Sequence, residues 1–154
     1  MIKKTPFNNR SVEAALYYVR LKTHSGASLF DLSEETSLTS TSAAQIVADE
    51  LLLAAGDRGI TLDQWVIVPD AIHALVFIRE NRPDPEASVG KPRLLTSFIA
   101  SFKAATAKRI NLIRNQPGSP VWQRSYNEQH VEDEYMLSRL RARISSADRV
   151  VVSS

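Results

Sequence analysis

A single histidine in a strand–turn–strand pattern is the residue of this sequence that comes nearest to a metal site. The stretch WVIVPDAIHALVFI, residues 65–78, predicts a strand, a tight turn at Pro69-Asp70 and a second strand that contains His73. Side chains two residues apart on a strand point to the same side, so a metal on His73 would need a second ligand at position 71. That residue is Ala71, which binds no metal. His73 is therefore either the remnant of a metal site or an ordinary core residue.

Charge is unevenly distributed along the chain, although the net charge is only +2. Residues 28–89 carry eleven acidic and three basic residues, whereas residues 91–125 carry seven basic residues and no acidic one. Cations without acidic neighbours create a positive field that attracts phosphate, so the second segment is a candidate nucleic-acid surface. The candidate contacts are Lys103, Lys108, Arg114 and Arg124. The alternative is a solvated helix face whose acidic partners come from elsewhere in the fold.

Composition excludes several classes of protein. A chain of 154 residues is most simply one domain, and the absence of cysteine excludes disulfides, thiolate zinc sites and cysteine nucleophiles. No run of about 18 apolar residues occurs, so we expect no membrane-spanning helix. The first residues, MIKKTPFNNRS, lack the apolar segment of a secretory signal, and we expect a cytoplasmic protein.

The spacing of apolar residues predicts an α+β domain. The expected elements are strands over residues 14–22, 62–68 and 72–79, and helices over about 41–55, 94–115 and 133–145. Thr39 or Ser40 is the expected N-cap of the first helix. The second and third strands are nearly continuous apolar runs, as expected of central strands covered on both faces. We expect an antiparallel sheet with two main helices on one face, spanning residues 13–146, between a flexible arm (1–12) and a tail (147–154).

Four segments, in order along the chain, resemble one known family. They are YYVRLKTHSGASLF, SAAQIVADELL, WVIVPDAIHALVFI, and RLLTSFIASFKAATAKRIN followed by PVWQRSYNEQHVEDEYMLSRLRARI. Over roughly residues 14–144 the chain resembles the REP-associated tyrosine transposases, which belong to the single-tyrosine HUH endonucleases. The resemblance implies a ferredoxin-like sheet, a two-fold dimer and binding of hairpin DNA. It also implies a metal held by two histidines and a tyrosine nucleophile on the last helix.

The residues at the implied catalytic positions do not match that chemistry. The two histidines fall on Ala71 and His73, the nucleophilic tyrosine falls on Arg143, and a further histidine falls on Gln129. Tyr135, the only tyrosine expected on the last helix, lies about 12 Å from position 143 along the helix axis. These departures from the family's pattern predict a catalytically inactive domain that needs no cofactor, with a divalent metal such as Mg²⁺ required only if the site were still active.

Three functions are compatible with these residues. The first is an inactive transposase-derived domain that binds hairpin or single-stranded DNA, with Arg143 contacting a phosphate. The second is a protein–protein interaction subunit of a larger complex, which the acidic segment favours and which Tyr17, Tyr18, Leu29 and Phe30 could anchor. The third is an enzyme whose rearranged site joins Asp70, His73 and a tyrosine. Separation of the acidic residues of 28–89 from the basic residues of 91–125 on the folded surface would favour nucleic acid, and interleaving of the two would favour a protein partner.

Overall fold

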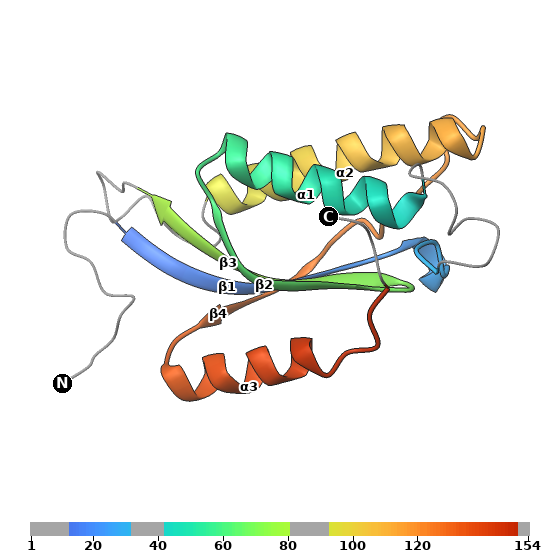
Figure 1. The fold of residues 1–154 in the computed structure, drawn as a ribbon. Coiled ribbons are helices and arrows are strands. Elements are labelled where there is room, and N and C mark those ends of the chain that lie inside the picture. The colour runs from blue at the N-terminus through green and yellow to red at the C-terminus, as the bar shows by residue number, and fades with distance from the viewer. Residues whose placement is uncertain (1–12, 32–41, 81–92, 151–154) are drawn as a thin grey trace.

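The computed structural model describes residues 13–31, 42–80 and 93–150 (Figure 1). Residues 1–12 and 151–154, predicted as an arm and as the end of a tail, lie outside the described residues. The helices and strands are β1 (Glu13–Lys22), a 3₁₀ turn (His24–Gly26), α1 (Ala43–Asp57), β2 (Thr61–Val68), β3 (Ala71–Glu80), α2 (Arg93–Ile113), β4 (Asn127–Val131) and α3 (Glu134–Ser145).

The four strands form one antiparallel sheet in the order β2-β3-β1-β4. This order, with α1 between β1 and β2 and α2 between β3 and β4, is that of the ferredoxin-like fold. Helices α1 and α2 pack together on one face of the sheet, as the sequence predicts, and α3 covers the other face (Figure 1). None of the described helices is both long and apolar enough to cross a membrane.

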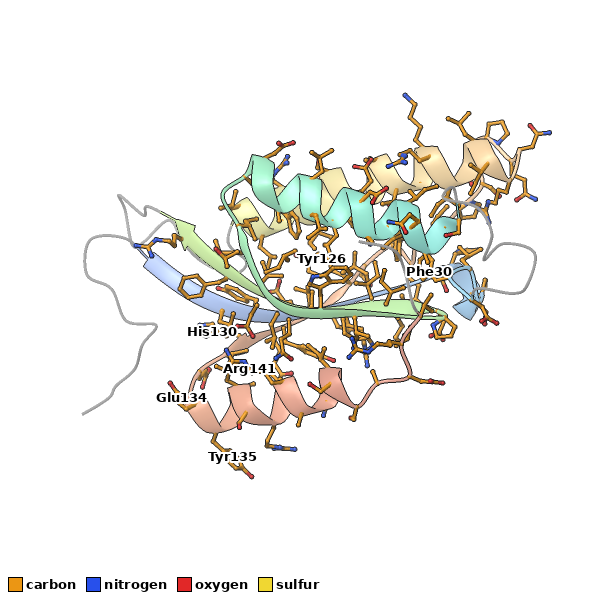
Figure 2. All side chains as sticks on the ribbon, viewed as in Figure 1. Phe30, Tyr126, His130, Glu134, Tyr135 and Arg141 are labelled. Carbon is orange, nitrogen blue, oxygen red and sulfur yellow. The ribbon has the colours of Figure 1, made fainter. Side chains whose placement is uncertain are left out.

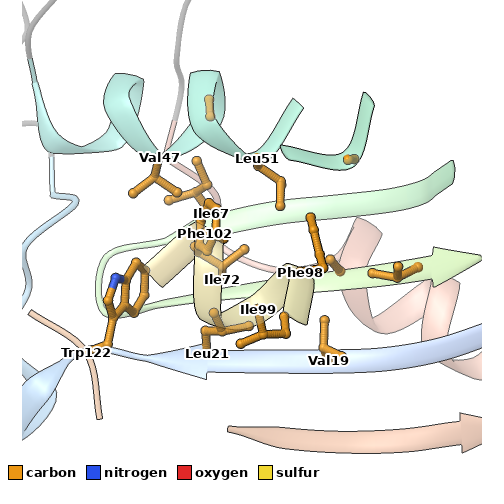
Figure 3. Packing of buried hydrophobic residues seen from close by; sticks show 14 of the residues in the cluster. Val19, Leu21, Val47, Leu51, Ile67, Ile72, Phe98, Ile99, Phe102 and Trp122 are labelled. Carbon is orange, nitrogen blue, oxygen red and sulfur yellow. The ribbon is translucent and has the colours of Figure 1, made fainter. Parts of the chain in front are cut away.

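The larger core lies between the sheet and the α1/α2 layer. Val19 and Leu21 of β1 and Ile72 of β3 pack with Val47 and Leu51 of α1 (Figure 3). Helix α2 contributes Leu95, Phe98, Ile99, Phe102 and Ile110. Trp122, which precedes β4, is buried in this core between Phe30 and Phe102, and its Nε1 donates to Thr106 Oγ1 at 2.9 Å. An indole held in this way is part of the core and is not available to stack on a base.

A second, smaller core lies under α3. Leu16 and Tyr18 of β1 pack there with Val66 and Leu75, against residues on one side of α3, which are Leu137, Leu140 and Ile144. Asp133 caps the start of α3, because its Oδ1 accepts from the backbone N of Met136 at 2.8 Å. Both faces of the sheet are therefore buried, which explains the nearly continuous apolar runs in β2 and β3.

Two local predictions need correction. Helix α1 begins at Ala43 and is capped by Ser42, whose Oγ accepts from the backbone N of Gln45, and not by Thr39 or Ser40. β2 is an edge strand and not a central one. Part of its outer edge is nevertheless covered, because the backbone N of Val150, in the C-terminal tail, donates to the carbonyl oxygen of Ile67 at 2.7 Å. This tail contact was not predicted.

The Trp122–Thr106 hydrogen bond gives a stability prediction. Thr106→Val keeps the shape of the side chain but leaves the buried indole N–H without its acceptor. We expect the free energy of unfolding to fall by about 1–3 kcal/mol, measured as a lower urea midpoint at an unchanged m-value.

A double-mutant cycle isolates this interaction. In a Trp122→Phe background the same Thr106→Val change should cost clearly less, since the indole donor is already gone. Leu112→Ala is the surface control, because Leu112 is 72% exposed, and it should change the midpoint little. Equal costs of Thr106→Val in both backgrounds would contradict the assigned role of the hydrogen bond.

Candidate functional site

The pleat of the sheet places the residues at the two implied metal positions on the same face. In the β1–β3 register His73 lies opposite Arg20, and Ala71 lies opposite Lys22. Directly opposed residues of an antiparallel pair point to the same side, so Ala71, His73 and Arg20 all lie on the α3 face. The prediction that positions 71 and 73 share a side is therefore confirmed.

His73 is half-buried and hydrogen-bonded within the protein. Its Nδ1 lies 2.7 Å from Tyr18 Oη. The pKa of His73 is lowered from its ordinary value of 6.5, because burial disfavours the charged ring and the cations Arg20 and Arg143 repel it. Asp70 opposes this shift but does not outweigh it. At neutral pH His73 is thus a neutral, anchored residue of the sheet.

The residues around His73 do not fit a divalent metal. Ala71 is buried and offers only a methyl group, and Asp70 lies exposed in the β2–β3 turn. Among the described residues no three histidine, cysteine, aspartate or glutamate side chains come close enough together to hold a metal ion. Hard cations such as Mg²⁺ require several oxygen ligands in an octahedral array, which one imidazole does not supply.

Arg143 lies close to His73 in space although it is 70 residues away in the chain. It occupies the last turn of α3, and its guanidinium carbon is 6.0 Å from the centre of the Tyr18 ring. Next to it is an open pocket of about 260 Å³ between α3, β1 and β4. The residues that line the pocket are Tyr18, Arg20, Asn127, Glu128, Gln129 and Arg143. Two positions that the sequence singled out, Arg143 and Gln129, therefore belong to one cavity.

Tyr135 does not approach this pocket. Its side chain is 73% exposed and projects from α3 away from the sheet (Figure 2). The guanidinium carbon of Arg139, one helical turn further on, lies 5.8 Å from its ring centre. Tyr135 is therefore on the wrong side of α3 to replace a nucleophile at position 143. The tyrosine that does meet His73 is Tyr18, through the hydroxyl contact described above.

Two of the four basic candidates on and after α2 hold the protein's own backbone. Lys103 Nζ donates to the carbonyl oxygens of Gln123 at 2.7 Å, Ser125 at 3.2 Å and Arg124 at 3.4 Å. Arg114 donates to Asn111 Oδ1 at 2.8 Å and to the carbonyl oxygen of Pro120 at 3.1 Å. Both side chains thus hold the segment between α2 and β4, which contains Trp122, against α2. Lys108 and Arg124 are exposed, and neither forms an ion pair with a residue that the structure describes.

Acidic and basic residues are partly interleaved on the folded surface. Arg109 of α2 pairs with Glu50 of α1 at 3.0 Å. Arg141 of α3 binds Asp63 of β2 with both Nε and Nη2, at 2.9 and 2.8 Å, in the space between α3 and the sheet (Figure 2). Of these two pairs only Arg109–Glu50 joins the acidic and basic segments that the sequence criterion compares, and at that place the interleaving favours a protein partner. It does not extend to Arg143, which has no ion-pair partner among the described residues.

Arg20 and Asn127 also belong to this site, although neither was predicted from the sequence. Arg20 Nη2 donates to Asn127 Oδ1 at 3.3 Å, across the β1–β4 pair in which the two residues are opposite one another. Because side chains alternate between the two faces along a strand, Arg20 could have been predicted on the same side of β1 as Tyr18. No sequence signal, however, gave the register with β4, a five-residue strand rich in polar residues.

Comparison with known proteins identifies the class of the fold. No family model and no curated protein matches the sequence. Among the solved structures that match are two that each cover 94% of this chain. One, a "putative transposase" from Deinococcus radiodurans R1, is 21% identical, with a TM-score of 0.53 and 96% of its own chain covered. The other, a REP-associated tyrosine transposase bound to a REP hairpin, is 13% identical, with a TM-score of 0.50 and 68% covered. The domain thus has a transposase-like fold, as the sequence resemblance predicts.

The lowered pKa of His73 gives a prediction for the pH dependence of stability. As pH falls, the unfolded chain gains a proton at this ring before the folded chain does. We therefore expect the free energy of unfolding to be undiminished above pH of about 6.5 and to decrease as pH falls below it. Urea midpoints across this range, with an NMR titration of the His73 ring, would measure both quantities.

Two variants separate His73 from other titrating groups. His73→Gln should flatten the loss of stability at low pH, whereas replacing the exposed His24 by Gln should leave the profile as in the wild type. An NMR titration of His73 with a midpoint above 6.5 would contradict the prediction.

Proposed function

We propose that this domain binds nucleic acid, hairpin or single-stranded DNA, and does not cleave it. The observation that carries the proposal is the arginine at position 143, where the family resemblance implies the nucleophilic tyrosine. Beside it His73 is a single histidine, where the resemblance implies a pair of metal-binding histidines. Arginine cannot act as the nucleophile, because its guanidinium remains protonated, but it is well suited to bind a phosphate. Loss of cleavage need not abolish binding, because phosphate contacts position a nucleic acid independently of the chemistry done on it.

Fold and surface charge support binding. One protein with this fold is bound to a REP hairpin. On this chain Lys108, Arg124 and Arg143 are exposed cations without an ion-pair partner among the described residues. They are the side chains that we propose as phosphate contacts. Lys103 and Arg114 stay in the proposal only as the residues that hold the segment of Arg124 in place.

The proposal includes no cofactor. Binding through guanidinium and ammonium groups needs no divalent ion, so affinity for DNA should not depend on Mg²⁺ beyond its contribution to ionic strength. A homodimer with two-fold symmetry remains a prediction from the family resemblance.

The test is binding of a labelled DNA hairpin at several salt concentrations, with Mg²⁺ or with a chelator, followed by a denaturing gel. We expect affinity to fall linearly on a log–log plot against salt and no cleaved or protein-linked DNA. Arg124→Ala should reduce the slope by about 0.9, and Lys108→Ala should reduce it by no more than that.

Arg109→Ala is the matched control on α2, since Glu50 already neutralises that charge, and it should leave the slope nearly unchanged. Absence of binding at low salt would refute the proposal. A covalent protein–DNA product would refute its catalytic part alone.

A second function, a protein–protein interaction subunit, is favoured by the surface of α1. Leu52 and Leu53 are adjacent on this helix and 53% and 58% exposed. Acidic residues flank them, namely Asp49, Glu50 and Asp57. The anchors that the sequence suggested, Tyr18 and Phe30, are instead buried in the cores, and Tyr17 and Leu29 are partly buried.

This alternative predicts that α1, and not the pocket, carries binding. Replacing Leu52 and Leu53 together by Ser should abolish capture of a protein partner without lowering the urea midpoint, because both side chains already face solvent. Hairpin binding should be unchanged in the same variant. If capture persists in the double variant, the α1 surface is not the interface.

A further inference from the structure

The pocket between α3, β1 and β4 has a positive charge that no described residue neutralises through an ion pair. Arg20 and Arg143 both line it. The acidic residue in its lining is Glu128, which lies opposite Val19 and therefore points to the α1/α2 face. There Glu128 Oε1 accepts from Tyr126 Oη at 3.3 Å. Neither Arg20 nor Arg143 forms an ion pair with any described residue. Two guanidinium groups without a carboxylate favour an anion between them.

Arg20 also carries a donor that the described protein does not use. Its Nη2 donates to Asn127 Oδ1, whereas its Nε is buried and has no hydrogen-bond acceptor among the described residues. A buried N–H without an acceptor costs free energy, and an acceptor that reaches it from the pocket would remove that cost. Because Asn127 Oδ1 already accepts from Arg20, the amide group of Asn127 is oriented to donate through its Nδ2.

The other groups in the lining also suit an oxyanion. Gln129 lies opposite Tyr18 in the β1–β4 register and therefore on the same face as Arg20 and Asn127. Its amide can donate, as can the Tyr18 hydroxyl when it is not bonded to His73. Planar guanidinium groups bind phosphate oxygens in pairs, which gives such a site geometric preference for phosphate over a halide ion.

We propose that this pocket is a phosphate-binding site in which Arg143 and Arg20 hold one phosphate group and Asn127 and Gln129 donate to its remaining oxygens. The inference deepens the proposed function and rests on it for the source of the phosphate, which is the backbone or a terminus of a DNA strand. Free inorganic phosphate shares this chemistry and is the other source. No bond is made or broken in the site.

The experiment follows backbone amide resonances of residues 127–129 by NMR while inorganic phosphate, and separately a DNA hairpin, is added to the folded domain. We expect saturable shifts at these residues with both ligands. Arg143→Gln should abolish the phosphate-induced shifts and weaken hairpin binding by roughly tenfold or more, since charge-assisted hydrogen bonds are the strong ones. It should also lower the salt slope by about 0.9.

Arg79→Gln is the matched control. Arg79 is an exposed arginine on the same face of β3, six residues from His73 and therefore about 20 Å along the strand. Its replacement changes the net charge equally and should leave the phosphate shifts unchanged. Arg20→Gln should act like Arg143→Gln, and its urea midpoint shows whether the fold is retained.

The outcomes distinguish this inference from the proposed function. Hairpin binding that is unaffected by Arg143→Gln would overturn the phosphate site and leave nucleic-acid binding standing. Phosphate shifts that require Arg143, without hairpin binding, would support the site and refute the proposed function. No shift with either ligand would overturn the inference, as would equal shifts in Arg143→Gln and the wild type.

Discussion

The alternation of side chains along β1 and β3 is the constraint on which the rest of this structure depends. Because α1 and α2 cover one face and α3 the other, both sets of alternating residues are buried. One set contributes Val19, Leu21 and Ile72 to the larger, apolar core. The other set contains Tyr18, Arg20 and His73, so polar groups enter a layer that is otherwise apolar. A shift of one residue in register would exchange the two sets, and the register is therefore strongly specified.

The polar side chains on the α3 face are accommodated in two ways. They form hydrogen bonds within the protein, or they lie beside the pocket between α3, β1 and β4. His73 is neutral and bonded to Tyr18, which lowers the cost of burying it. Arg20 lies beside the pocket. Position 143 neighbours the buried Ile144 but is itself exposed, so it lies at the flank of the α3 stripe. An arginine there costs no core packing, whereas its charge raises the positive potential of the whole pocket.

The secondary structure and the sheet could largely be read from the sequence, because apolar periodicity and the Pro69-Asp70 turn mark β2, β3, α1 and α2 directly. The shared side of Ala71 and His73 follows from strand spacing, whereas the proximity of position 143 to His73 came from the family resemblance. What could not be predicted depends on register and helix placement. The partners of Lys103 and Arg114 are backbone carbonyls of a loop, and the partner of Arg109 is on another helix. A charge count along the chain cannot distinguish such cations from free ones.

The contacts that basic residues of α2 make within the protein change where we propose the nucleic-acid surface to lie. The sequence places it on the basic helix α2, where the structure instead gives Lys103, Arg109 and Arg114 partners within the protein. Cations that lack a carboxylate partner among the described residues include Arg124, just before β4, and Arg20 and Arg143 on the α3 side of the sheet. A phosphate chain that contacted Arg124 and the pocket would therefore follow β4, the edge strand opposite β2. On this geometry Lys108, on the far side of the sheet, would contribute less than Arg124, and the difference between those two variants locates the surface.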